Sequence, residues 1–227
     1  MYNTPQKLVA EFIGTFTLIF AGVAAICSNQ MAGGGSGLVG VALAHGLAIA
    51  VMIAAVGHVS GGHFNPAVTA AFWVTKKMGT LEAAGFWIAQ LAGGAAAAYL
   101  LTLFFSPEVW HRVSLGTPSL AADVTPTFGM LIEAVMTFLL VFVIFGAAAD
   151  KNSAFGKLAP FAIGLTITVD ILAGGVLTGA AMNPARAFGP ALAARVWANQ
   201  AVYWVGPLAG GIAAGVLYDT LLMKKTE

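Results

Sequence analysis

The sequence SGGHFNPAVT, residues 60–69, interrupts one of the most hydrophobic stretches of the chain with two glycines, a histidine, an asparagine and a proline. The sequence TGAAMNPARA, residues 178–187, interrupts a second such stretch with the same Asn-Pro-Ala core, here followed by an arginine. Proline lacks the backbone donor that a helix interior requires, so neither segment suits an unbroken helix. The repetition of the same break indicates that the two segments share one structural task.

The composition places both segments in a membrane protein. Of the 227 residues, 59% are hydrophobic and only 8% are charged, whereas about a quarter of the residues in a soluble domain are charged. The net charge of +1 and the absence of basic clusters argue against a nucleic-acid partner, because phosphates demand many Lys and Arg side chains on one face. Membrane lipid is therefore the expected surrounding.

The few polar side chains exclude several chemistries. Cys27 is the single cysteine, which rules out an internal disulfide and a cysteine-based zinc site. The four histidines and the few carboxylates form no ligand-spaced cluster and no nucleophile–base pair. We therefore expect no enzymatic activity, no metal and no cofactor.

Hydrophobic run lengths predict six spanning helices and two short ones. A bilayer core needs about 20 apolar residues per helix. Runs of this length cover about 8–27, 38–57, 84–104, 128–149, 158–176 and 201–222. Each Asn-Pro-Ala begins a shorter apolar piece, of which residues 66–76 are one. At a rise of about 1.5 Å per residue such a piece reaches about 16 Å, or roughly half of the hydrocarbon core.

The two halves of the chain repeat each other. GLAIAVMIAAVGHVSGGHFNPAV (46–68) aligns without a gap with GLTITVDILAGGVLTGAAMNPAR (164–186), WIAQLAGG (87–94) with WVGPLAGG (204–211), and EFIGTF (11–16) with EAVMTF (133–138). Because each half holds three spans, the second half enters the membrane from the opposite side. The sequence thus predicts a single all-α membrane domain over 1–227. Its inverted repeats cover about 8–104 and 128–222, and the two half-helices re-enter toward each other.

The distribution of basic residues predicts the orientation. One side of this topology receives Lys7, Lys76, Lys77, Lys151, Lys157, Lys224 and Lys225. The other side receives Arg112, Arg186 and Arg195. Positive side chains gather on the cytoplasmic side of membrane proteins. We therefore expect an integral protein of the cell (inner or plasma) membrane with both termini in the cytoplasm.

Each asparagine of the motif suits the start of a half-helix. Asn65 and Asn183 would occupy the N-cap, and Pro66 and Pro184 the first helical position, where a missing N–H is no loss. If each side-chain oxygen accepts from its own first turn, the amide NH2 is left to donate into a lumen. Two helix N-termini that meet at mid-membrane also disfavour cations there. The pattern predicts a narrow polar passage for neutral molecules.

These features closely resemble the aquaporin (major intrinsic protein) family. The resemblance is carried by the paired Asn-Pro-Ala loops, by the repeated glutamates Glu11 and Glu133, and by GHVSGGHFNPAV and GAAMNPARAFGP. It implies a homotetramer in which each protomer has its own pore, passing water or small neutral solutes and excluding protons and ions. It also implies a central pore constriction formed by Asn65, Pro66, Ala67, Asn183, Pro184 and Ala185.

The resemblance further implies a selectivity filter formed by His45, Ile171, Ala180 and Arg186. Strict water channels of the family usually carry Phe, His and Thr or Cys at the first three positions. A filter of His, Ile, a small residue and Arg is similar to that of plant tonoplast intrinsic proteins, which pass ammonia, hydrogen peroxide and sometimes urea besides water. Some of those proteins carry a further filter histidine in the central connector, where this chain has Pro118.

Other polar residues have supporting or open roles. Glu11 and Glu133 are expected to accept hydrogen bonds that hold the re-entrant loops. His63 resembles the family's loop histidine near the cytoplasmic mouth. Asp170 has no mate in the repeat, since Met52 occupies the matching position. Both a packing role and a pore role remain open for it.

Three alternatives compete with this interpretation. If His45 only packs, the pore is strictly water-selective. Glycerol facilitators of the family typically carry Asp after the motif's arginine and lack an aromatic pair early in the last span, whereas this chain has Ala187 and Tyr203-Trp204. A secondary transporter also uses broken helices but needs a coupling site, for which Asp170 is the one unmatched carboxylate.

Overall fold

Six helices of the computed structural model, which describes residues 2–154 and 156–224, are long and apolar enough to cross a membrane. They are α1 (Thr4–Met31), α2 (Gly37–Ser60), α4 (Thr80–Phe104), α6 (Pro126–Ile144), α7 (Ala159–Thr178) and α9 (Val202–Leu217). Helices α6 and α9 continue through π-helical turns at Phe145–Ala149 and Tyr218–Leu222. The expected all-α fold with six spans is confirmed, and the helices begin and end within a few residues of the expected runs.

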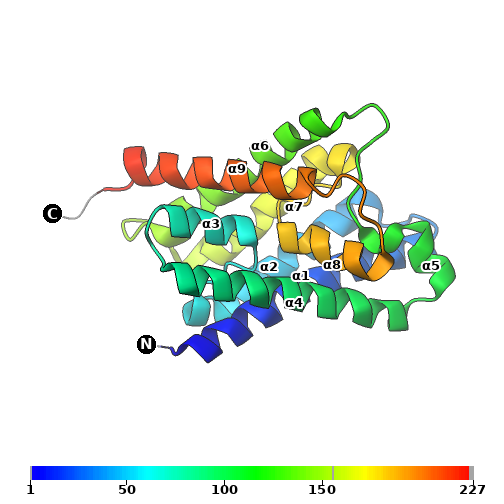
Figure 1. Cartoon of the computed structure of the whole chain (residues 1–227), viewed down its shortest axis with the longest axis horizontal. Coiled ribbons are helices and arrows are strands. Elements are labelled where there is room, and N and C mark those ends of the chain that lie inside the picture. The colour runs from blue at the N-terminus through cyan, green and yellow to red at the C-terminus, as the bar shows by residue number, and fades with distance from the viewer. Residues whose placement is uncertain (1, 155, 225–227) are drawn as a thin grey trace.

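The two Asn-Pro-Ala segments begin the short helices α3 (Pro66–Val74) and α8 (Pro184–Ala194), which have nine and eleven residues. Figure 1 shows them entering from opposite ends of the molecule, between the long helices. The connector carries a further short helix, α5 (Pro107–Arg112), and a 3-10 turn at Ser114–Gly116. At nine to eleven residues, α3 and α8 are too short to cross the bilayer.

The long helices pack in matching groups in the two halves. Helix α1 contacts α2 and α4, while α6 contacts α7 and α9, and α2 joins the halves by packing against α7. The half-helices lie against glycines of the outer helices. A β-carbon on Gly94 would lie 2.9 Å from the Ala185 carbonyl oxygen, and one on Gly211 would lie 3.1 Å from that of Ala67. Small residues thus let the half-helices approach the spanning helices closely.

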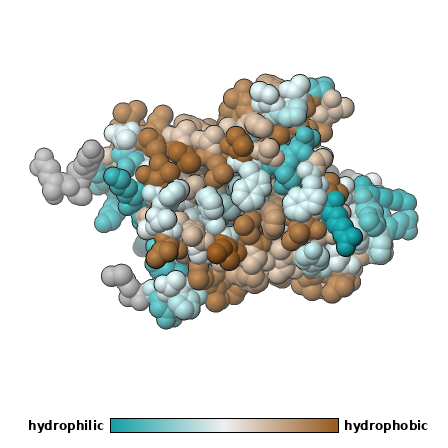
Figure 2. Space-filling view, in the orientation of Figure 1, coloured by the Kyte–Doolittle hydropathy of each residue, from teal (hydrophilic) through white to brown (hydrophobic). Residues whose placement is uncertain are grey.

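The surface matches a lipid environment. Hydrophobic residues dominate the middle of the face in Figure 2, and hydrophilic residues gather toward its two ends. Large apolar side chains such as Leu103, Leu165 and Val176 are exposed on the outer faces of the long helices. Among the described residues, ion pairs join Lys7 to Glu82, Lys77 to Asp219 and Arg112 to Glu108. The chain is an integral membrane protein.

The start of α1 and the end of the last span lie at the same end of the molecule (Figure 1). The short helix α5, which carries Arg112, lies at the opposite end. Lys7 pairs with Glu82, and Lys77 pairs with Asp219 near the end of the last span. Lys225, which contributes to the expected lysine-rich side, lies outside the described residues.

Candidate pore and its lining

Asn65 and Asn183 cap the two half-helices as their position before proline predicts. The Asn65 Oδ1 accepts from the Ala67 N–H at 2.8 Å, and the Asn183 Oδ1 accepts from the Ala185 N–H at 2.9 Å. Both asparagines have extended backbones, with φ of −157° and −153°. Each side-chain oxygen is therefore directed at its own helix, and each amide group points away from it.

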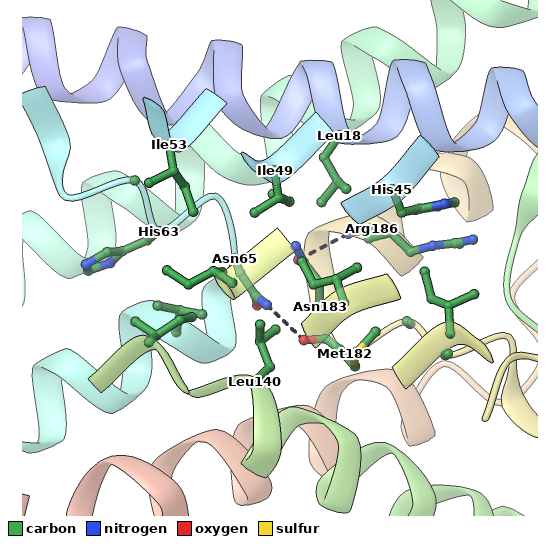
Figure 3. A pocket seen from close by; sticks show the side chains of 18 residues that line it. Leu18, His45, Ile49, Ile53, His63, Asn65, Leu140, Met182, Asn183 and Arg186 are labelled. Atoms are coloured by element: carbon green, nitrogen blue, oxygen red, sulfur yellow. Dashed lines mark hydrogen bonds between the residues drawn. The ribbon is translucent and has the colours of Figure 1, made fainter. Parts of the chain in front are cut away.

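The amide groups of the two asparagines also tie the two loops together. Figure 3 shows one of these bonds, in which the Asn65 Nδ2 donates to the Met182 carbonyl at 2.8 Å. The Asn183 Nδ2 donates to the Phe64 carbonyl at 2.9 Å. This differs from the expectation that the whole NH2 is left for the lumen. An amide nitrogen has two hydrogens, so one of them joins the loops and the other remains for a molecule in the cavity.

The carbonyls that accept these bonds belong to residues with a left-handed backbone. Phe64 has φ 48° and Met182 has φ 50°, a conformation that costs a non-glycine residue about 1–3 kcal/mol. The Phe64 N–H donates to Glu11 Oε2 at 2.7 Å, and the Met182 N–H donates to Glu133 Oε2 at 2.7 Å. The two carboxylates thus fix the strained residues whose carbonyls hold the asparagines.

Each glutamate also accepts a second loop N–H and a hydroxyl. The Glu11 Oε1 accepts from the His63 N–H at 3.0 Å and from the Ser60 hydroxyl at 2.6 Å. Gln90 of α4 adds a donor to Glu11 Oε2 at 2.7 Å. Glu11 is fully buried. Three elements therefore meet at one carboxylate, which is how a buried acidic group is accommodated inside a membrane protein.

Glu133 repeats this arrangement in the second half. Its Oε1 accepts from the Ala181 N–H at 2.9 Å and from the Thr178 hydroxyl at 2.7 Å. The sequence reasoning missed the hydroxyl donors Ser60 and Thr178. Their signal is visible, because the two residues occupy matching positions in the aligned segments 46–68 and 164–186.

His63 lies at the end of the cavity opposite Arg186 (Figure 3). Its Nδ1 is 3.1 Å from the Thr69 hydroxyl. The ring centroid lies 4.5 Å from that of Phe72 and 5.3 Å from that of Phe86. The side chain therefore joins the first loop to α3 and also lines the cavity.

A narrow cavity of about 30 Å³ runs past the two asparagines. The cavity therefore has room for water-sized molecules. Its aliphatic wall comes from α1, α2, α6 and α7 and comprises Leu18, Ile49, Ile53, Leu140, Ile144, Ile163, Ile167 and Ile171. Val68 of α3 and the loop residues Gly62, His63 and 180–182 also line it. The passage is apolar except at a few fixed positions.

A second, wider cavity of about 270 Å³ lies toward the connector, which lines it with Gly116, Thr117 and Pro118. His45, Ile171 and Arg186 line both cavities. These three residues therefore stand at the boundary between the wide cavity and the narrow one. Ala180, the fourth expected filter residue, lines the narrow cavity alone.

Backbone carbonyls orient the two polar side chains at this boundary. The Arg186 Nη1 donates to the Gly116 carbonyl at 2.7 Å, the one hydrogen bond that its guanidinium makes among the described residues. The His45 Nδ1 lies 2.8 Å from the Val41 carbonyl. Figure 3 shows the two side chains lying next to each other. Arginine has five N–H donors, so the guanidinium keeps donors for a molecule that passes.

Asp170, a carboxylate of a spanning helix, lies outside this site. Asp170 is buried, but it is not among the residues that line either cavity. Within residues 2–154 and 156–224, no three His, Cys, Asp or Glu side chains gather as a metal site. The arrangement offers hydrogen-bond donors at the centre and at one boundary, separated by an aliphatic wall.

Comparison with known proteins identifies the family. The family model described as "Major intrinsic protein" matches residues 2–218. "Aquaporin TIP4-4" of Zea mays is 45% identical over 225 residues, which cover 97% of this chain and 88% of that relative. "Aquaporin TIP2-1" of Arabidopsis thaliana is 41% identical over 228 residues, covering 98% of this chain and 89% of the relative.

A solved structure adds a likeness of fold. The aquaglyceroporin from Plasmodium falciparum matches with a TM-score of 0.84, at 23% identity and with 97% of each chain covered. At that identity the likeness shows the fold alone. The family match and the curated relatives confirm the resemblance seen in the sequence and the expectation of a channel rather than an enzyme, and they set aside the secondary-transporter alternative. The chain therefore belongs to the major intrinsic protein family and is an aquaporin-type channel.

Proposed function

We propose that this channel passes water and also small neutral solutes such as ammonia and hydrogen peroxide, while it excludes protons and ions. The observation that carries the proposal is the boundary between the two cavities, where His45, Ile171 and Arg186 meet. Every solute that moves from the wide cavity into the narrow one passes these side chains. We therefore assign the selectivity filter to them, together with Ala180.

The chemistry of these side chains supports a wider solute range than water alone. Ile171 cannot form a hydrogen bond, and Ala180 occupies less room than the Thr or Cys usual in strict water channels. The polar groups at the boundary are His45 and Arg186. A neutral molecule with a lone pair, such as ammonia or hydrogen peroxide, can accept from the guanidinium, whereas a cation is repelled by its charge.

The central constriction supports the exclusion of protons. We propose that a water molecule beside Asn65 and Asn183 accepts from their remaining amide hydrogens, so that its oxygen cannot accept a proton from a neighbouring water. The N-termini of α3 and α8, formed by Pro66-Ala67 and Pro184-Ala185, add partial positive charge at the same place. The aliphatic wall on either side offers no relay.

We also propose that the chain forms one channel domain with inverted repeats over about 8–104 and 128–222. The matching contacts of Glu11 and Glu133 and the cross-bonds between the loops support the repeat. A homotetramer follows from the family resemblance. Cytoplasmic termini are supported by the lysine distribution and by the position of the start of α1 and the end of the last span at one end of the molecule (Figure 1).

The cell membrane is the membrane expected from the sequence. The curated relatives, whose names carry the designation TIP, do not support this expectation. Fractionation of the source cells with an antibody against the chain decides between the cell membrane and an internal one. Recovery with cell-membrane markers supports the expectation, and recovery with an internal membrane overturns it.

Two narrower functions compete with this proposal. A strictly water-selective pore results if His45 only packs and does not meet solutes. A glycerol facilitator is disfavoured by Ala187 and by Tyr203-Trp204, which differ from the usual residues of glycerol-conducting members. Glycerol flow through the wild-type protein at the rate of ammonia would favour that alternative.

The deciding experiment compares ammonia and water flow in reconstituted vesicles. The wild type is measured beside the double substitution His45→Phe with Ile171→His, using stopped-flow alkalinisation under an ammonium gradient and an osmotic jump. We expect the variant to keep most water flow and to lose ammonia flow, because a narrower filter with other donors replaces the wide one. The matched control is Leu47→Phe with Leu172→Phe, two exposed positions on the same helices, and it should change neither flow. Equal ammonia rates in wild-type, variant and protein-free vesicles would rule the wider filter out.

A further inference from the structure

We propose that Gly22 of α1 is a positioning residue that sets the width of the filter, because its missing side chain gives the His45 ring a place to lie against α1. The inference rests on the proposed filter role of His45. It concerns a residue outside the filter itself, since Gly22 lines neither of the two cavities at the filter.

The contact between the two residues is close. A β-carbon on Gly22 would overlap three atoms of the His45 ring, namely Nε2, Cδ2 and Cε1. Gly22 is buried, and His45 is 3% exposed. The opposite edge of the ring is fixed by the bond between Nδ1 and the Val41 carbonyl at 2.8 Å. The ring is thus held between a carbonyl of its own helix and the bare backbone of α1.

Packing alone fixes the Nε2 edge of the ring. A carbonyl oxygen only accepts, so the Nδ1 that faces Val41 must carry the ring proton. In the neutral ring the Nε2 is then an acceptor, and it is buried without a hydrogen-bond partner among the described residues. No donor pulls the ring toward α1, and the ring lies there because Gly22 leaves the space open. A side chain at position 22 would close that space.

Displacement of the ring would narrow the filter. The ring is confined by α1 on one side, and His45 meets Ile171 and Arg186 where the two cavities join. A β-carbon on α1 therefore drives the ring toward these two residues. Protein interiors have little free volume to absorb such a shift. The displaced ring would therefore occupy part of the filter and make it narrower.

The repeat shows that this space is particular to the first half. The alignment of 11–16 with 133–138, continued along the helices, matches Gly22 with Ile144. The alignment of 46–68 with 164–186, extended by one residue, matches His45 with Ile163. Both isoleucines line the narrow cavity. The first half therefore pairs a glycine with a histidine at this place. The second half has two aliphatic side chains there instead.

The test is a double-mutant cycle on flow rates. Wild type, Gly22→Ala, His45→Ala and the combined variant are reconstituted in proteoliposomes, and water and ammonia flow are measured per inserted protein. We expect Gly22→Ala to lower water flow by about fivefold or more and ammonia flow at least as much, since overpacking displaces the ring. In the His45→Ala background the same substitution should change both flows by less than about twofold, because no ring remains to be displaced.

Controls separate a positioning role from a folding defect. Gly85→Ala is the matched helix substitution, because Gly85 faces only the flexible end of Leu8 beside an apolar groove on the outer surface, and it should leave both flows unchanged. If Gly22→Ala alone does not fold, water flow through His45→Ala is compared with water flow through His45→Ala combined with Gly22→Ala. A fall in flow in that pair means that position 22 acts independently of the ring, which overturns the inference.

Two outcomes in the folded proteins also overturn it. One is unchanged water flow in Gly22→Ala, and the other is an equal loss of flow in the two His45 backgrounds. Failure of the proposed solute range gives a different result, since it removes ammonia flow from the wild type. The cycle on water flow remains readable in that case and decides the role of Gly22 by itself.

Discussion

Replacing Glu133 with glutamine tests how the second loop is held, because it removes one acceptor and keeps the shape of the side chain. In the native protein Oε1 accepts from Thr178 and Ala181, and Oε2 accepts from the Met182 N–H at 2.7 Å. A glutamine retains the most bonds when its oxygen takes the place of Oε1. Its NH2 group then faces the Met182 N–H, and two donors cannot bond each other.

The structure sets the size of the effect. At least one buried hydrogen bond to a carboxylate is lost, which costs about 1.5–3 kcal/mol. Each 1.4 kcal/mol is tenfold in an equilibrium constant, so opening of the loop becomes about 10- to 150-fold more frequent. Met182 holds a strained left-handed backbone at φ 50°, and once its N–H bond is lost, only the Asn65 bond to its carbonyl still holds that conformation.

Hydrogen–deuterium exchange of the purified protein in lipid nanodiscs measures this directly, since the rate at which a buried amide exchanges follows the opening equilibrium. The Met182 amide should exchange about 10- to 150-fold faster in Glu133→Gln. The mirror substitution Glu11→Gln should instead accelerate exchange at His63 and Phe64. Glu82→Gln, which alters a partly exposed ion pair with Lys7, should leave both loops unchanged. Exchange at Met182 within twofold of the wild type would show that Glu133 does not hold the second loop.

Three further substitutions test the filter, the packing of α8 against α4, and an ion pair near the end of the last span. Arg186→Val should allow a cation current in planar bilayers while size-exclusion chromatography shows an intact assembly, and the absence of any current would contradict the charge barrier. Gly94→Val should lower the melting temperature by about 2–12 °C, because the added carbons crowd the Ala185 carbonyl and overpacking costs about 1–3 kcal/mol; no change would show that α8 can move aside. Lys77→Ala should lower it by less than about 4 °C, since its partly exposed bond to Asp219 contributes at most about 1 kcal/mol, and a larger fall would show that this contact anchors the last span.

The spans and the loop supports are predictable from the sequence because they repeat. Run length indicates the six helices, and the paired Asn-Pro-Ala segments place Asn65 and Asn183 at helix starts. The cross-bond from Asn65 to the Met182 carbonyl is not predictable in the same way. It joins residues far apart in the chain, and it depends on the left-handed backbone at Met182, for which no glycine gives a signal.

The pore wall escapes sequence reasoning for a different physical reason. In a soluble protein the buried face of a helix is apolar and the outer face is polar, so periodicity separates them. On α2 the side chains of Ile49 and Ile53 line the cavity, while Leu47 and Val51 are exposed on the outer surface. Lipid and pore wall both select aliphatic residues, so the pattern does not distinguish them.

The contact of Gly22 with His45 was equally hidden. Glycine is common in membrane helices as a point of close helix packing, and nothing in its sequence neighbourhood singles out one ring. Only the placement of α1 beside α2 shows which side chain fills the space.

The central claim is that water passes while protons do not, and parallel flux measurements on one preparation of wild-type proteoliposomes test it most directly. An osmotic jump reports water flow, and a pH-sensitive dye under an imposed pH gradient reports proton flow. We expect shrinkage far faster than in protein-free vesicles, together with a proton flux equal to that of protein-free vesicles. A proton flux above the protein-free value, or shrinkage no faster than without protein, would contradict this expectation.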